Sequence, residues 1–156
     1  MKGRPAGKSV VQRRRGIAAV ELALCLPFLL ILGLGAIEVC NIMYVRARMY
    51  SAAYEAARYA TRPTTASTLA ASSPQAASSL VTNYCTTLLG QLGVSGGTVT
   101  LQVLDDTTSQ PKSITAAGPM DQVTVSVAAP LNQNYLTSYV INTSITLNAS
   151  ATLIVE

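Results

Sequence analysis

A carboxylate close behind a basic cluster, at the start of a long apolar run, is the group in this chain with the clearest capacity for chemistry. Arg13, Arg14 and Arg15 directly precede Gly16, and Glu21 follows the glycine by five positions. An ionised side chain inside a membrane is costly, and residues of this kind are functional by default. Glu21 is therefore a candidate functional residue. The plainer alternative is that Gly16 is an ordinary loop glycine and that Glu21 snorkels to the lipid headgroups.

The element that must hold these residues is a membrane span. Hydrophobic residues make up 49% of the 156 residues and charged residues 12%, which is unusually apolar for a soluble protein. The run from Ile17 to Ile37 has Glu21 as its one charged residue, and it is close to the ~20 residues that cross a bilayer core. We expect membrane lipid around this single span.

Charge places the two flanks of the span. Basic residues gather in front of it, at Lys2, Arg4, Lys8, Arg13, Arg14 and Arg15. An excess of Lys and Arg marks the cytoplasmic flank, so the rest of the chain should lie outside. The five remaining Lys and Arg residues and all seven acidic residues follow Gly16. The net charge of this part of the chain, without its termini, is therefore 5 − 7 = −2. The net charge of +4 thus belongs to the leader, and we expect no nucleic-acid partner.

Helical spacing continues beyond the membrane, to about Ala60. One apolar stripe alternates steps of four and three, through Ala36, Cys40, Met43, Ala47, Tyr50, Tyr54 and Ala57. An unbroken helix from Ile17 to Ala60 would measure about 65 Å, over twice the bilayer core, so half of it must stand outside. Pro27 should kink the helix inside the bilayer, because it removes one backbone donor and clashes with the preceding turn.

The remainder predicts a small α+β domain. Arg62 and Pro63 should end the long helix, and residues 64–73 read as a connection. Ser73 can cap a second helix with Pro74 in its first turn. Alternating apolar residues then predict an antiparallel sheet of about three strands, near residues 99–103, 123–127 and 145–155, while residues 105–121 read as a loop. The chain divides into a leader (1–16), a helix (17–62) and an external domain (63–156).

Several of these residues together resemble a known family. The segment from Arg14 to Pro27, then Glu38, then the segment from Ala52 to Ala60 look like the TadE-like family (TadE and TadF), minor pseudopilins of the tight-adherence or Flp pilus. The resemblance implies a pilin-like fold and a class III, prepilin-type signal. A prepilin peptidase would cut between Gly16 and Ile17, and Glu21 would then be the fifth residue of the new chain.

The resemblance also implies a role for each residue of the signal. Glycine lets the backbone extend into a protease cleft, and the basic cluster of Arg13, Arg14 and Arg15 holds the bond at the cytoplasmic surface. The new ammonium on Ile17 would lie one helical turn from Glu21 and could neutralise it. In pilins this glutamate is held to set subunit register during assembly.

The implied partners are the peptidase, other pilin-like subunits and the inner-membrane pilus assembly platform. The location would be the bacterial inner membrane, with the N-terminus cytoplasmic and the C-terminal domain periplasmic. A different class of function stays open at this point, namely an uncleaved, signal-anchored extracytoplasmic binding module unrelated to pili. The two differ in whether the N-terminus is cut.

The remaining reactive residues do not indicate an enzyme. There is no histidine, no phosphate-cradling loop and no nucleophile motif, so we expect no catalytic residue and no cofactor. The acidic pair at Asp105 and Asp106 lies in a predicted turn and lacks the ligands of a calcium loop, and we expect no metal site. Cys25 lies in the span, so Cys40 and Cys85 are the pair available for a disulfide in an oxidising compartment.

Overall fold

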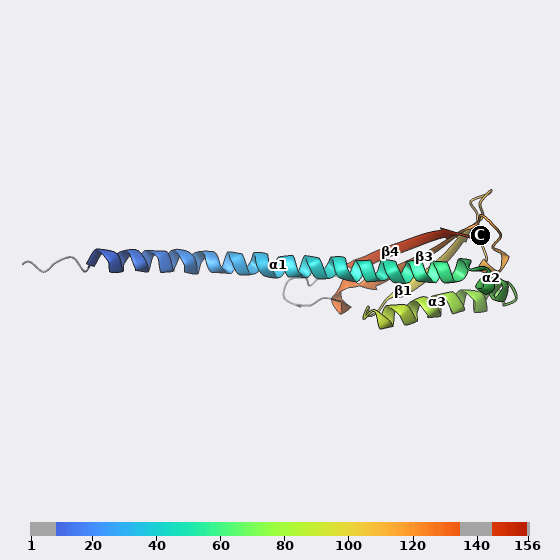
Figure 1. Ribbon diagram of the computed structural model, residues 1–156, viewed down its shortest axis with the longest axis horizontal. Helices are drawn as coiled ribbons and strands as arrows, with labels where there is room; N and C mark the ends of the chain where they lie inside the picture. The colour runs from blue at the N-terminus through green and yellow to red at the C-terminus, as the bar shows by residue number, and fades with distance from the viewer. Residues whose placement is uncertain (1–8, 135–144, 156) are drawn as a thin grey trace, which may run out of the picture. The chain divides into compact units, whose positions relative to one another are not determined.

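The computed structural model describes the backbone of residues 9–134 and 145–155, and the side chains of the same residues except 9–16 and 64. The chain separates into two compact units, Met1–Val39 and Cys40–Glu156. The described residues of the first unit are helical, and those of the second unit form helices and an antiparallel sheet (Figure 1). The predicted α+β class with a long N-terminal helix is therefore confirmed.

Helix α1 runs without interruption from Ser9 to Thr61. It begins eight residues before the predicted start at Ile17, so the segment before Gly16 is not wholly irregular. One glycine in a helix costs only ~1 kcal/mol relative to alanine, which the helix-forming residues around it can offset. α1 also continues through Pro27 without a break, and the kink at this residue stays a prediction.

The second unit buries a different face of α1 from the one predicted. Of the predicted stripe in this unit, Met43, Tyr50 and Tyr54 are exposed and Ala57 is fully buried. The buried face consists mainly of small residues, at Val45, Met49, Ala52, Ala53, Ala56, Ala57 and Ala60. Alanines let a neighbouring helix and strands approach the backbone of α1 closely, whereas tyrosines on that face would hold them away. Spacing alone did not distinguish these two faces.

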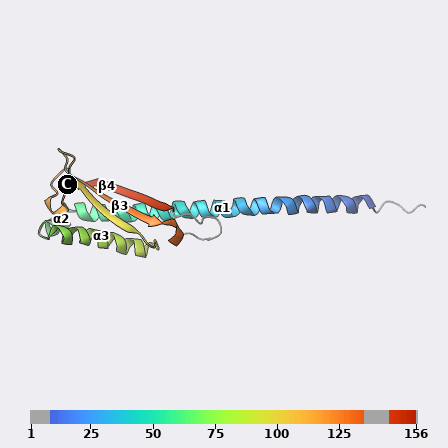
Figure 2. The same ribbon diagram turned by 180° about the vertical axis from the view of Figure 1, so that it is seen from behind.

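Two further helices follow α1. Residues Pro63–Ala70 form helix α2 where the sequence predicted an irregular connection, because Pro63 takes the first helical position and so starts a helix as well as ending one. Helix α3 spans Pro74–Gln91, and the Ser73 side chain caps it by accepting a hydrogen bond from the Ala76 N–H at 3.3 Å, as predicted. Figures 1 and 2 show α3 running beside the C-terminal part of α1.

The sheet has four strands where about three were predicted. They are β1 (Thr98–Leu104), β2 (Pro111–Lys112), β3 (Gln122–Pro130) and β4 (Thr146–Ile154), in the spatial order β2-β1-β3-β4 with every pair antiparallel. The additional strand β2 lies inside the segment predicted as a loop. Its two residues are too few to show an alternating pattern in the sequence. Two short 3-10 helices, Ile114–Ala116 and Leu131–Gln133, connect the strands.

The core lies on one face of this sheet. Val123, Val125 and Val127 of β3 are buried, together with Ala77, Val81, Cys85 and Leu89 of α3 and the small residues of α1. The opposite face carries polar side chains that bond within the sheet. The Thr98 hydroxyl donates to the Ala128 carbonyl at 3.1 Å, and the Thr124 and Thr152 hydroxyls lie 2.8 Å apart. This division follows from the two-residue period of strands.

Candidate functional site

The predicted processing site lies on the helical backbone of α1. Gly16 and Ile17 are both helical, and the Ile17 side chain is 59% exposed. The side chains of Arg13, Arg14 and Arg15 lie outside the described residues, so their predicted topological role stays a prediction. The bond between Gly16 and Ile17 is therefore inside a helix, and a protease that binds extended substrate must first unwind this turn.

Glu21 lies on the same side of α1 as Ile17. The two residues are four apart, which separates them by about 6 Å along the helix axis and about one turn around it. The Glu21 side chain is exposed, as are its neighbours Val20 and Leu22. This placement puts the carboxylate one turn from the nitrogen that a cut after Gly16 would free.

The helix around Glu21 has an apolar surface that nothing in its own unit covers. Large apolar side chains from Ile17 to Ile37 are exposed by about half or more, and the most apolar stretch of α1 has no buried residue. Among the described residues, α1 is the one helix long and apolar enough to cross a membrane, and it lies near the N-terminus. A surface of this size and polarity is typical of contact with lipid or with other apolar helices.

The predicted disulfide between Cys40 and Cys85 is absent, and both residues are free thiols. Cys85 is buried, and its Sγ lies 3.8 Å from the carbonyl oxygen of Ala52. Ala52 is twelve residues beyond Cys40 on α1, or about 18 Å along the helix axis, whereas a disulfide needs Cα atoms within ~7 Å. Burial also raises the pKa of the Cys85 thiol to about 11, which keeps it protonated and unreactive.

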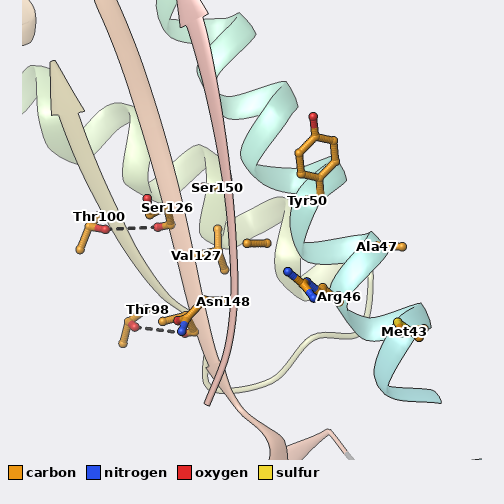
Figure 3. A pocket seen from close by; sticks show the side chains of 12 residues that line it. Met43, Arg46, Ala47, Tyr50, Thr98, Thr100, Ser126, Val127, Asn148 and Ser150 are labelled. Atoms are coloured by element: carbon orange, nitrogen blue, oxygen red, sulfur yellow. Dashed lines mark hydrogen bonds between the residues drawn. The ribbon is translucent and has the colours of Figure 1, made fainter. Parts of the chain in front are cut away.

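The exposed stripe of α1 borders a groove in the second unit. Met43, Arg46 and Tyr50 line it from α1, and Asn148 and Ser150 line it from β4 (Figure 3). Its volume is about 920 Å³. Figure 3 shows the Arg46 side chain reaching from α1 towards β4, the strand nearest to the helix in this view. The groove therefore combines an apolar and aromatic wall, one guanidinium group and neutral polar groups.

A charged cluster at the other end of β1 is structural. Lys112 Nζ lies 2.8 Å from the Asp121 carboxylate and 3.0 Å from that of Asp105. Asp105 also accepts hydrogen bonds from the backbone N–H groups of Thr107 and Thr108, which closes the turn after β1. The acidic pair at Asp105 and Asp106 thus serves a turn, as its sequence context predicted.

This cluster shifts the pKa of each of its members. The pKa of Asp105 is lowered, first by the Thr107 side chain and then by Thr108 and Lys112. The pKa of Asp121 is lowered chiefly by Lys112, and that of Lys112 is raised chiefly by Asp121. All three groups are thereby held in their charged forms at neutral pH. Among the described residues, no group of three or more His, Cys, Asp or Glu side chains could hold a metal ion.

Sequence reasoning missed the ion pair between Lys112 and Asp121 and the burial of Glu38. Asp121 is 3% exposed and Glu38 is 2% exposed, although both types of side chain are normally at the surface. A proline just before Lys112 and a strand just after Asp121 were visible in the sequence. The ion pair between Lys112 and Asp121 depends on two turns whose geometry the sequence does not give.

Fold and site together define a class of protein, namely an α+β protein with a long N-terminal helix that is apolar enough to cross a membrane. Within that class, residues 16–58 match the model of the TadE-like protein family. The proteins of this family are structural components associated with the Tad pilus, and the family is not known as an enzyme family. No curated protein and no solved structure matches the chain.

Proposed function

We propose that the protein is a minor pseudopilin, a structural and assembly component of a tight-adherence (Flp) pilus that a prepilin peptidase processes. The observation that carries this proposal is where the family match begins. It starts at Gly16, the residue on the leader side of the proposed cut, and takes in Ile17, Glu21 and the whole apolar run. The signal and the span thus belong to one matched segment.

Processing would change the chemistry of the N-terminus. Glycine at position 16 weakens the helix by ~1 kcal/mol relative to alanine, which favours the extended backbone that a peptidase binds. Cleavage would leave an ammonium group on Ile17, one turn from Glu21. Their attraction offsets part of the cost of holding a carboxylate at an apolar boundary, either within the chain or with a neighbouring subunit.

Assembly would then depend on exposed faces of α1. The span would pack in the inner membrane against other pilin-like subunits and the assembly platform, with the N-terminus cytoplasmic and the external domain periplasmic. Outside the span, Met43, Tyr50 and Tyr54 remain exposed at helical spacing, with 61%, 54% and 41% of their surfaces accessible. A contiguous apolar surface of this kind is typical of a protein contact.

The proposal predicts that Glu21→Ala inserts into the membrane normally but assembles poorly. Apolar character is retained, so the membrane-bound amount should be unchanged, whereas the ion pair with Ile17 is lost. An intramembrane pair is worth a few kcal/mol, so pilus output should fall about tenfold or more. Sheared pili and membrane-bound protein are measured in the same cells by immunoblot.

Glu55→Gln is the matched control for this variant. Glu55 is also on α1, but it is an exposed carboxylate 3.8 Å from Arg58, and such pairs contribute little. The control should therefore leave pilus output unchanged. Undiminished output from Glu21→Ala, with normal membrane insertion, would contradict the assembly role of Glu21.

A further inference from the structure

The two edges of the sheet differ in how well they are protected. On the first edge, β2 pairs with Val103 and Leu104 of β1, and both of its residues discourage further pairing, since Pro111 lacks an N–H and Lys112 is charged. The rest of this edge is the five residues of β1 from Thr98 to Gln102, which have no described strand partner on that side. The β4 edge has nine residues from Thr146 to Ile154, with neither a charge nor a proline. Among the described strands, β4 is bonded to β3 alone. Native proteins usually block long edges, so an unblocked edge indicates a pairing site.

Helix α1 provides a wall along this edge. The groove of about 920 Å³ joins Met43, Arg46 and Tyr50 of α1 to residues 148–150 of β4, and it extends across β3 to the first residues of β1 (Figure 3). A second pocket, of about 360 Å³, joins Arg58 and Arg62 to Leu153 and Ile154 in the second half of β4. We call these two hollows together the β4 groove. It reaches β4 at residues 148–150 and again at residues 153–154.

The β4 groove is positively charged. Arg46 lines one part, Arg58 and Arg62 line the other, and among the described residues no acidic side chain lines either. Two nearby carboxylates of the domain, Asp105 and Asp121, are held by Lys112. Glu55 approaches Arg58 at 3.8 Å on an exposed surface, where pairing is weak. A negatively charged ligand would therefore meet the guanidinium groups of Arg46 and Arg62, and that of Arg58 beside its weakly paired Glu55.

The geometry points to an extended, acidic segment of a partner protein, added to β4 as a fifth strand of the sheet. Backbone hydrogen bonds to the free edge would hold it, and its carboxylates would meet the arginines of the β4 groove. Arg46 and Arg58 lie twelve residues apart, about 18 Å along α1, which corresponds to acidic residues about five or six positions apart in a strand. The β4 strand of a second copy does not fit, because it carries no charge.

The apolar part of the wall sets a second requirement for the partner segment. Tyr50, Tyr54 and Ile154 are all substantially exposed beside the β4 groove. A strand with alternating apolar residues would cover these side chains with one face and leave its polar face in water. This inference rests on the second unit, Cys40–Glu156, alone, and it holds or fails independently of the pilus role.

The test uses the full chain in detergent micelles and a fluorescent peptide. The peptide has about nine residues of alternating valine and threonine, with two aspartates about six positions apart. Two control peptides replace both aspartates by asparagine, or carry methyl groups on alternate backbone nitrogens to block strand pairing. Fluorescence anisotropy measures the dissociation constant for each.

We expect saturable binding of the aspartate peptide and at least about tenfold weaker binding of the methylated one, because the backbone hydrogen bonds are lost. The variants R46Q and R58Q should each weaken binding by about threefold, as for exposed ion pairs. The control R48Q should not, because Arg48 stacks on Tyr44 and lines neither part of the β4 groove. Absence of saturable binding, equal binding of either control peptide, or binding insensitive to both R46Q and R58Q would overturn the proposal.

Discussion

At the residue scale, this protein uses its charged groups in two distinct ways. Lys112, Asp105 and Asp121 neutralise one another within the external domain, and the Asp121 side chain is almost fully buried. Glu21 is exposed on an apolar helix. Buried charges normally pair with other groups of their own chain. A charge on an apolar exposed surface can be neutralised by a group of another subunit or by a newly formed chain end. The first group therefore serves folding, and Glu21 fits a role in assembly.

The Lys112 cluster predicts a defined dependence of stability on pH. The pKa values of Asp105 and Asp121 are lowered in the folded domain, so their contribution is present above the unfolded values near pH 4 and is lost as pH falls through the folded values. The raised pKa of Lys112 changes the stability of the domain only in strongly alkaline solution. Lys112→Met should therefore lower the thermal midpoint at pH 7, with a smaller difference below about pH 4.

Circular dichroism melts across this pH range, on the full chain in detergent, provide the measurement. Arg62→Met is the control, since it also removes one exposed cation from the domain without touching the cluster. Thermal midpoints of Lys112→Met and the wild type that differ by the same amount at pH 7 and in acid would be the contrary result. That result would show that the lowered pKa values of Asp105 and Asp121 do not depend on Lys112.

At the element scale, residue types located the elements but not the contacts between them. The cap at Ser73 and the alternating strands follow from local chemistry, and both were predictable. The buried face of α1 was not, because two stripes of suitable spacing coexist and tertiary packing selects the one rich in alanine. Strand β2 and the free Cys85 likewise depend on turns and on helix placement. The prediction of the Glu21 site rests on a signal within a few consecutive residues, and the role of this residue stays a prediction.

The N-cap of α3 gives the test at this scale. Ser73→Ala removes the side-chain oxygen that accepts from the Ala76 N–H, and the free energy of unfolding should fall by about 1 kcal/mol. Ser79→Ala is the control on the same helix, because its hydroxyl bonds only a carbonyl that the helix already uses. Chemical denaturation followed by circular dichroism compares the two. Equal effects would mean that the cap contributes nothing specific.

At the scale of the whole molecule, the two compact units have different sources of stability. The second unit, Cys40–Glu156, buries a core between its helices and one face of its sheet, whereas the apolar surface of the first unit is exposed and needs an apolar environment. We therefore expect the domain to unfold without removing α1 from the membrane. The arrangement suits a subunit that is anchored by one unit and presents the other to partners.

A core variant tests this separation. Leu89→Ala should lower the free energy of unfolding of the external domain by about 3 kcal/mol, because Leu89 is 2% exposed and its loss leaves a cavity. Leu80→Ala, on the same helix but 44% exposed, should have a far smaller effect. Every tyrosine lies at position 44 or later, so tyrosine fluorescence in urea reports on the domain. Loss of the variant from the membrane fraction would contradict independent anchoring.

The most direct test of the proposed function is the intact mass and N-terminal sequence of the membrane-extracted chain, from cells with and without their prepilin peptidase. A pseudopilin should begin at Ile17 when the peptidase is present and retain residues 1–16 when it is absent. An intact leader in both strains would contradict the proposed processing. It would leave a signal-anchored module in which Glu21 has no ammonium group to meet.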